Sequence, residues 1–258
     1  MTRTLQTLGI DVDLRTHPWR YPGPAAPSSG LLSGGSFHEL RRDDGTWTDA
    51  DGTGLEALLD DAGVPGLDDR QAVVAIGSNA SPAVMHRKFT RLEVSTTVPM
   101  LAGDLAGVGL GHIPRVNPAG YVAAVPLVAP GGRTAVVVSL LTPAQADALD
   151  ATEQSYARCA GGDGLTVAGH DEPWSLYVSE LGAIGGTDGL PLPLGTQSDL
   201  WDRLRTDPVL AGLAGDGDHR EVARRLAADG SLRDRVRAHL VTHDRVVPTG
   251  MEDLLPTA

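Results

Sequence analysis

The sequence predicts a mixed α/β fold, because strand-like runs alternate with helix starts through its middle part. QAVVAIG (71–77) is a short apolar run that ends at glycine, which is typical of a buried strand. Ser81 and Pro82 then stand where the N-cap and the first residue of a helix are expected. The order repeats at AVVVSLL (135–141), which leads into the capping-box sequence Thr142-Pro143-Ala144-Gln145.

Further strands are predicted around these two units. Residues 98–111 indicate strands that are broken by glycines. Residues 121–128 indicate one strand, and a turn at 130–132 (Pro-Gly-Gly) should join it to the strand at 135–141. Residues 175–181 indicate one more strand.

The first 70 residues differ from the rest of the chain. Proline and glycine are dense over 18–30, and this density disfavours long helices and central strands. Trp19 and Tyr21 are nevertheless apolar anchors that a free linker does not need. We therefore expect an extended arm on the surface of the core, with one short helix at 54–62.

The last part of the chain is expected to be helical. Leucine, valine and alanine recur there at three-to-four spacing among charged residues. The sequence thus divides into an arm (1–70), a core (71–182) and a helical extension (183–258). The expected helices of the extension cover 199–205, 220–229 and 231–243.

Composition excludes some functions. The 258 residues carry a formal net charge of −12, whereas nucleic acids and anionic membranes are bound by basic surfaces. No stretch reaches the roughly 18 apolar residues of a membrane span. The single cysteine, Cys159, has no partner for an internal disulfide. We therefore expect a cytoplasmic protein that acts on a small molecule rather than on nucleic acid or membrane.

Two motifs, in this order, resemble the γ-glutamylcyclotransferase (AIG-type) family. The first is VVAIGSNASPAVMHRKF (73–89), a strand that leads through Gly-Ser-Asn into a helix. The second is VVVSLLTPAQADALDATEQSYAR (136–158), with a Thr-Pro helix start and an LDxxE sequence. Between them, GYVAAVPLVAPG (120–131) is similar to the middle hairpin of the family. The resemblance covers about residues 72–158, and the arm and the extension lie outside it.

The resemblance implies a closed mixed α/β barrel and one reaction. The α-amine of a γ-glutamyl amide or peptide attacks its own side-chain carbonyl, which releases 5-oxoproline and a free amine without metal or organic cofactor. Gly77, Ser78 and Asn79 match the substrate loop of the family, and Glu153 matches its acid/base glutamate. Ile76 stands where the family usually has tyrosine, so that wall of the substrate site lacks a ring and a hydroxyl.

These residue types suit the reaction. One carboxylate can take a proton from the attacking ammonium and return it to the leaving amine. Glu153 falls near the C-terminal end of the helix that begins at Pro143, where the helix dipole disfavours negative charge. Gly77 allows close backbone approach, and the helix N-terminus that follows offers free N–H groups. The alternatives are that Glu153 is a solvent-facing helix residue and that the segment around Gly77 is an ordinary strand–turn–helix connection. Tyr156 is either a hydrogen-bond donor in the site or a tyrosine at the core edge.

Other side chains are weaker candidates. Arg115 and Arg158 could bind a substrate carboxylate, although arginines are more often at the surface. Lys88 is expected at the surface. His239 and His243 have the spacing of metal ligands on a helix, but no third ligand is evident in the sequence.

Three functions remain open at this point. The first is a cyclotransferase of the transferase or lyase type. The second is an amide hydrolase or acyl transferase in which Glu153 activates water. The third is a non-catalytic relative that binds a small ligand. Apolar surfaces of the arm and the extension could narrow the mouth of the site or form a homodimer.

Overall fold

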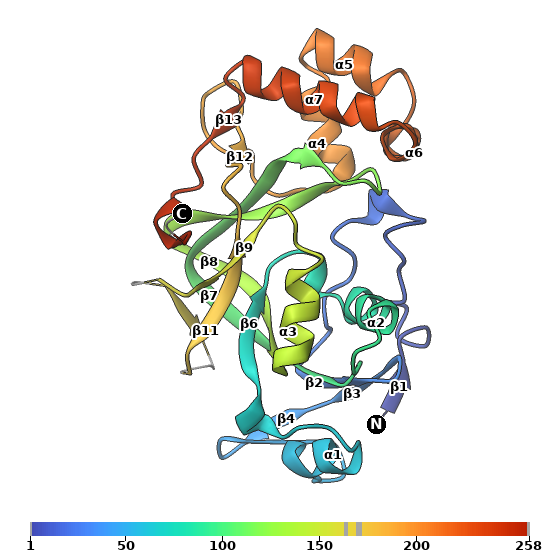
Figure 1. The fold of residues 1–258 in the computed structure, drawn as a ribbon, viewed down its shortest axis with the longest axis vertical. Coiled ribbons are helices and arrows are strands. Elements are labelled where there is room, and N and C mark those ends of the chain that lie inside the picture. Colours follow the sequence, from blue (N-terminus) through green and yellow to red (C-terminus); the bar gives the residue numbers. More distant parts are fainter. Residues whose placement is uncertain (1, 163–164, 169–171, 257–258) are drawn as a thin grey trace.

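The centre of the computed structural model is one large β-sheet, and the model describes residues 2–162, 165–168 and 172–256. The strand order is β1-β3-β2-β7-β8-β6-β11-β9, and β10 pairs with β7 (Figure 1). β6 runs parallel to β11 and antiparallel to β8, so the predicted mixed α/β class is confirmed. The strands are β1 (Thr2–Thr4), β2 (Gly30–Ser33), β3 (Ser36–Glu39), β6 (Gln71–Ala75), β7 (Val98–Val116), β8 (Val122–Leu141), β9 (Ala157–Ala160), β10 (Thr166–Ala168) and β11 (Trp174–Val178).

The expected closed barrel is not found in the described part of the chain. β9 pairs only with β11, whereas β10, which follows it, crosses to β7. No ladder joins β9 to β10 or to β1 among the described residues, so the sheet stays open. Two small ladders lie apart from it, namely β4 (Arg41–Asp43) with β5 (Thr46–Thr48) and β12 (Ala183–Ile184) with β13 (Val246–Val247).

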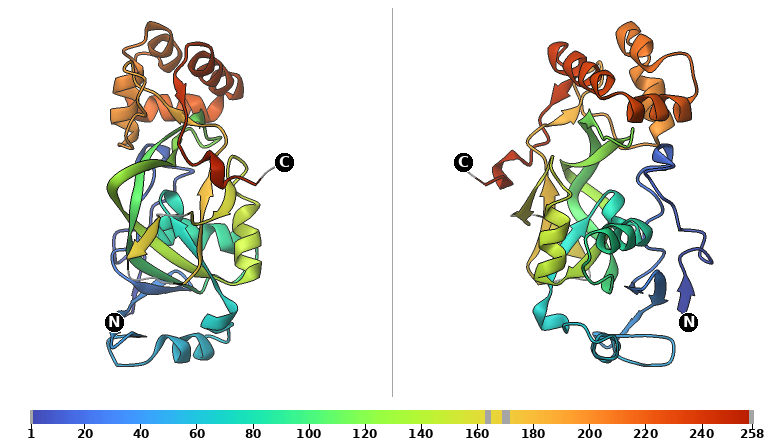
Figure 2. Two further views of the ribbon diagram at one scale, coloured as in Figure 1. Left: turned by 90° about the vertical axis from the view of Figure 1, so that its left-hand side faces the viewer. Right: turned by 45° about the vertical axis from the view of Figure 1, so that its right-hand side comes forward.

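β7 and β8 form one long antiparallel ribbon, which contradicts the two separate strands predicted over 121–141. The register runs from Met100 opposite Ser139 to Val116 opposite Val122. The register shifts between Ala106 and Val108, where Gly107 on β7 lies opposite residues 129–132 of β8. The Pro-Gly-Gly sequence therefore forms a bulge rather than a hairpin turn, since a bulge accepts residues that a regular ladder excludes. The ribbon curves through the central part of the molecule (Figure 2).

Seven α-helices occur in the described residues. α2 and α3 lie beside the central sheet (Figure 1), and fully buried side chains such as Met85, Phe89 and Leu141 fill the space between helices and sheet. The capping box of α3 is confirmed, because Gln145 N donates to Thr142 Oγ1 at 3.3 Å and Thr142 N donates to Gln145 Oε1 at 2.9 Å. The helices are α1 (Leu55–Asp61), α2 (Pro82–Arg91), α3 (Pro143–Asp150), α4 (Gln197–Leu204), α5 (Pro208–Ala214), α6 (His219–Ala228) and α7 (Gly230–Thr242).

The arm is more than a surface layer. Its strand β2 lies between β3 and β7 in the sheet, and Leu32 on β2 is fully buried. The expectation that proline and glycine keep this segment out of the sheet is therefore wrong for residues 30–39. These residues follow the proline-rich stretch, and their apolar side chains Leu31, Leu32 and Phe37 are all buried.

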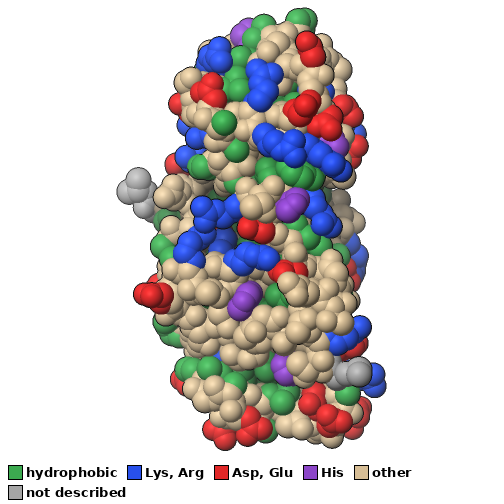
Figure 3. Space-filling model, turned by 90° about the vertical axis from the view of Figure 1, so that its right-hand side faces the viewer, with side chains coloured by type: hydrophobic (Ala, Val, Ile, Leu, Met, Phe, Trp, Pro, Cys, Tyr) green, Lys and Arg blue, Asp and Glu red, His purple; other side chains and the backbone are tan. Residues whose placement is uncertain are grey.

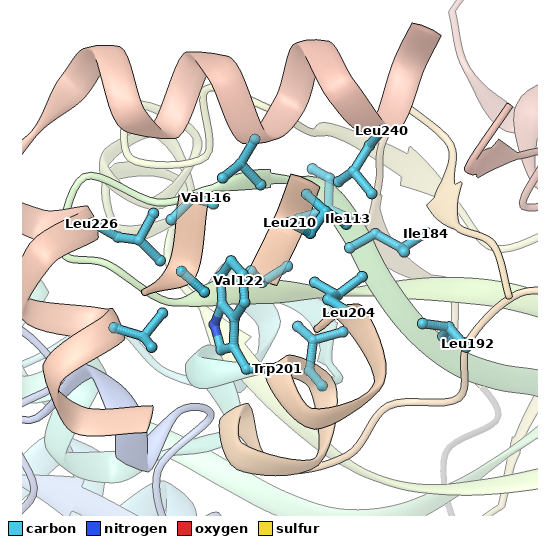
Figure 4. Close-up of a cluster of buried hydrophobic side chains, with 14 of the residues drawn as sticks. Ile113, Val116, Val122, Ile184, Leu192, Trp201, Leu204, Leu210, Leu226 and Leu240 are labelled. Carbon is cyan, nitrogen blue, oxygen red and sulfur yellow. The ribbon is translucent and has the colours of Figure 1, made fainter. Parts of the chain in front are cut away.

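Helices α4 to α7 cover one end of the β7–β8 ribbon (Figure 2). Trp201 on α4 is 1% exposed and packs with side chains from both the ribbon and the helices (Figure 4). α4, α6 and α7 begin and end within two residues of the helices that the sequence predicts. α5 was not predicted, although Asp207 and Pro208 are its N-cap and first residue. None of the described helices is long and apolar enough to cross a membrane.

His112 connects this end of the ribbon to the segment before α4. Its Nε2 accepts a hydrogen bond from Gly195 N at 3.1 Å, and the side chain is buried. Burial lowers the pKa of His112 from 6.5 to about 4. Between these two values the unfolded chain binds a proton that the folded protein does not. Stability should therefore be fully present above pH 6.5 and should fall as the pH drops towards 4.

We expect this loss to reach on the order of 2 kcal/mol in the free energy of unfolding. Urea titrations at pH 7, 6, 5 and 4 measure it. His112→Gln should reduce the pH dependence of the free energy of unfolding between pH 4 and 6.5. His17→Gln, at an exposed histidine, should leave this dependence unchanged. Equal pH dependence in all three proteins would exclude His112 as the cause.

Candidate active site

One cavity of about 540 Å³ lies where the arm, β6, α2, the ends of β7 and β8, and the loop after α3 meet. This volume is within the roughly 300–1,000 Å³ of small-molecule sites. The residues proposed from the sequence all line it, namely Ile76, Gly77, Ser78, Asn79, Glu153 and Tyr156. The face of the molecule that carries the arm and α2 is shown in Figure 3.

The two sequence motifs meet through a direct hydrogen bond. Asn79 Nδ2 donates to Glu153 Oε1 at 3.1 Å, although the two residues are 74 positions apart. β6 ends at Ala75, and a 3-10 turn over Ser78–Ala80 carries Asn79 towards the loop that follows α3. Glu153 therefore lies beside the Gly-Ser-Asn loop in the cavity.

Lys88 completes this polar group, and its expected surface position is wrong. Its Nζ lies 2.6 Å from Glu153 Oε1 and 2.8 Å from Asn79 Oδ1. The side chains of Lys88 and Glu153 are only 16% and 15% exposed. Lys88 follows Val84 by four residues on α2, and both line the cavity. This spacing places both side chains on one face of α2, but only the fold shows that this face lines the cavity, so the sequence alone carries no signal for Lys88.

The two oxygens of Glu153 have different surroundings. Oε1 receives hydrogen bonds from Lys88 and Asn79 and a longer one, at 3.4 Å, from Thr152 Oγ1. Oε2 receives none from the residues that the structure describes. One oxygen is therefore held in place, and the other makes no hydrogen bond to the described residues.

A tyrosine from the arm lies against the Gly-Ser-Asn loop. A Cβ atom on Gly77 would approach the Tyr21 hydroxyl to 2.6 Å, which is too close, so this contact requires glycine. Tyr21 stacks on Tyr121 with ring centroids 4.5 Å apart. Ile76 is partly buried and packs against the hydrophobic cluster around Val74 and Leu176. The aromatic ring and hydroxyl that lie beside the loop therefore belong to Tyr21 of the arm.

Two tyrosines hold the backbone of Ala124 at the wall of the cavity. Ala124 N donates to the Tyr21 hydroxyl at 2.8 Å, and the Tyr156 hydroxyl donates to Ala124 O at 2.8 Å. β6 pairs with β8 only from Val137 to Leu141, so Ala124 lacks a strand partner on this side. Tyr156 is therefore placed in the site, with its hydroxyl already bound to the backbone.

The tyrosines of the cavity keep their protons at neutral pH. Burial raises the pKa of Tyr21 far above its usual value, and backbone hydrogen bonds from Ala124 and Ser78 offset this only in part. Burial also raises the pKa of Tyr121 to about 12, and the negative charge of Glu153 adds to the effect. The pKa of Tyr156 is raised for the same reasons. Each hydroxyl therefore acts as a hydrogen-bonding group and not as a base.

We expect Tyr21→Phe to lower the free energy of unfolding by about 1–2 kcal/mol, because the buried N–H of Ala124 loses its acceptor. The ring stack with Tyr121 remains in this variant. Urea denaturation measures the change. Tyr121→Phe is the matched control, since no hydrogen bond of the Tyr121 hydroxyl is found in the described residues, and it should cost clearly less. Equal losses in both variants would contradict this role of the Tyr21 hydroxyl.

Of the weaker candidate residues, Arg115 lines the cavity, whereas Arg158, His239 and His243 lie outside it. Arg115 lines the cavity and donates to Ser155 Oγ at 2.7 Å. Arg158 lies outside it and forms an ion pair with Asp150 at 2.9 Å. His239 binds Asp207 at 2.7 Å and stacks on His243. No group of three potential metal ligands occurs in the described residues, and Cys159 is buried.

Comparisons with known proteins identify little. No protein-family model matches the sequence, and no curated protein matches it. A solution structure of a protein from Arabidopsis thaliana is similar at 18% identity, with a TM-score of 0.31, over 73% of this chain and 93% of that one. This likeness is too weak to assign a family.

Proposed function

We propose that this chain is a γ-glutamylcyclotransferase-type enzyme that releases 5-oxoproline and a free amine from a γ-glutamyl amide, with Glu153 as general acid and base. The observation that carries the proposal is the arrangement around Glu153. Lys88, Asn79 and Thr152 hold one carboxylate oxygen, and the other has no partner in the described residues. The group lies in a cavity large enough for a small amide.

The pair of opposite charges in the cavity suits the α-amino-acid end of such a substrate. That end carries an ammonium and a carboxylate on one carbon atom. Glu153 would bind the ammonium through Oε2, and Lys88 would bind the carboxylate, with their charged atoms only 2.6 Å apart in the free protein. Asn79, which contacts both residues, would keep them in this arrangement.

The proposed reaction needs one proton acceptor that later becomes a donor. Glu153 takes a proton from the α-ammonium, and the freed amine attacks the γ-carbonyl carbon of the same molecule. The C–N bond of the amide then breaks as Glu153 gives the proton to the leaving amine. The ring nitrogen releases its second proton in the same collapse, and at neutral pH the free amine takes up one proton in return. Because nucleophile and carbonyl belong to one molecule, holding the folded conformer supplies much of the acceleration. The protonated Tyr21 hydroxyl, which lies next to Gly77, would donate a hydrogen bond to the carbonyl oxygen as that oxygen gains negative charge.

Product analysis tests the proposal. The purified protein is incubated with a set of γ-glutamyl amides, and 5-oxoproline and free glutamate are quantified. We expect 5-oxoproline with an equal amount of free amine. The same amides with an acetylated α-amine serve as control, because they lack the nucleophile and should give no product. Glutamate from the free amides together with N-acetylglutamate from the acetylated amides would instead indicate a hydrolase, and no product from either set would reject the proposed enzyme.

A further inference from the structure

The cavity is cationic although the protein is acidic. The whole chain has a formal net charge of −12. Lys and Arg side chains gather across the middle of the face that carries the arm and α2 (Figure 3). The charged residues that line the cavity are Arg15, Arg87, Lys88, Arg91, Arg115, Asp13 and Glu153. Positive charge concentrated at one cavity of an acidic protein indicates an anionic ligand.

Three of these cations are not neutralised by carboxylates. Arg87 forms an ion pair with Asp11, and Lys88 forms one with Glu153. Arg115 donates one hydrogen bond, to the uncharged Ser155. Within the described residues, Arg15 and Arg91 donate no side-chain hydrogen bond to the protein, and both are exposed.

Arg15 and Arg91 lie nearer to solvent than Lys88 and Glu153 do. Lys88 and Glu153 are about 15% exposed and form the inner part of the cavity, whereas Arg15 and Arg91 are exposed at its rim. Arg91 follows Lys88 by three residues on α2, so the two side chains are neighbours along one helix face. A ligand group that extended outwards from Lys88 along this face would lie beside Arg91.

We propose that the amine half of the substrate is anionic and is recognised by Arg15, Arg91 and Arg115. This inference rests on the proposed function, which places the glutamyl end at Glu153 and Lys88 and directs the leaving amine towards the rim. The shared chemistry is a carboxylate or phosphate group beyond the scissile amide, which a guanidinium binds through two hydrogen bonds. Asp13 is the rim carboxylate, and it already accepts the backbone N–H of Arg15 at 2.9 Å.

Binding measurements test the inference without depending on turnover. Calorimetry on Glu153→Gln compares γ-glutamyl-alaninamide, whose amine half is neutral, with γ-glutamyl-aspartate and γ-glutamyl-O-phosphoserine. We expect at least one of the two anionic compounds to bind about tenfold tighter or more than the neutral one, as charge-assisted hydrogen bonds predict. The difference should shrink as salt is raised. Comparing the two anionic compounds distinguishes carboxylate from phosphate recognition.

Variants assign the preference to residues. Adding both Arg15→Gln and Arg91→Gln to the Glu153→Gln protein should reduce the affinity difference between anionic and neutral compounds to about twofold or less. Adding Arg133→Gln, at an exposed arginine outside the cavity, should preserve this difference. Equal affinity for neutral and anionic compounds, no binding of any compound, or a preference that survives loss of both arginines would overturn the inference. An arginine-dependent anion preference without 5-oxoproline formation by the unsubstituted protein would support the anion site and reject the proposed reaction.

Discussion

Glu153→Gln is expected to lower turnover of a γ-glutamyl amide by roughly 10²–10⁴-fold, the range for loss of a general acid–base group. The substitution retains the shape of the side chain and one oxygen for Lys88 and Asn79, but it can no longer carry the proton. Substrate affinity should change much less than turnover. Initial rates of 5-oxoproline formation, with the dissociation constant from calorimetry, measure both quantities.

The control for this variant is Glu180→Gln, which changes an exposed carboxylate outside the cavity and should keep the original rate. Urea denaturation of both variants shows whether the fold is intact. A rate close to that of the unsubstituted protein after Glu153→Gln, on a substrate that the protein turns over, would exclude Glu153 as the base.

Lys88→Met is expected to raise KM by about 10–100-fold, because a charge-assisted hydrogen bond to the substrate α-carboxylate is lost. The loss also leaves Glu153, which is 15% exposed, without its nearest counter-charge. If Lys88 binds the substrate, the effect on KM should exceed the effect on kcat. Steady-state kinetics of 5-oxoproline formation separate the two.

Lys88→Arg provides the conservative comparison, since it keeps the positive charge and should restore most of the affinity. Arg133→Met removes an exposed cation outside the cavity and should leave KM unchanged. A fall in kcat alone, with KM unchanged in Lys88→Met, would mean that Lys88 positions Glu153 and does not hold the substrate.

The sequence predicted the local units of this fold well where each unit carries its own signal. The capping box at Thr142 and the Ser81-Pro82 helix start both mark true helix starts. Ser81 nevertheless makes no capping hydrogen bond, and its hydroxyl is buried without a partner in the described residues. Local sequence thus marked where the helix begins, while tertiary packing decided the contacts of the side chain.

Long-range pairing was predicted less well. The sequence predicts a turn at 130–132 where the structure has a bulge over 129–132, because Pro-Gly-Gly is equally compatible with both and only the partner strand decides between them. The inclusion of β2 in the sheet likewise depends on β7, which lies far along the chain. The open edge of the sheet depends on where β10 pairs, and no local pattern encodes that choice.

The candidate site was predicted in part, for the same reason. Glu153 and the Gly-Ser-Asn loop were found because they lie in recognisable motifs, and the structure brings them into contact. Tyr21 was noted only as an apolar anchor of the arm, since its place beside Gly77 follows from how the arm packs. Lys88 was missed because a lone lysine on a helix is usually solvent-exposed.

The crystal structure of Glu153→Gln with a γ-glutamyl amide bound would test the central claim most directly. The proposed function predicts the glutamyl end in the cavity, with its α-amine about 3 Å from the substituted side chain at position 153 and its α-carboxylate at Lys88. It also predicts the γ-carbonyl beside Gly77 and Tyr21. An amide bound outside this cavity, or bound in it with the α-amine directed away from position 153, would contradict the proposed function.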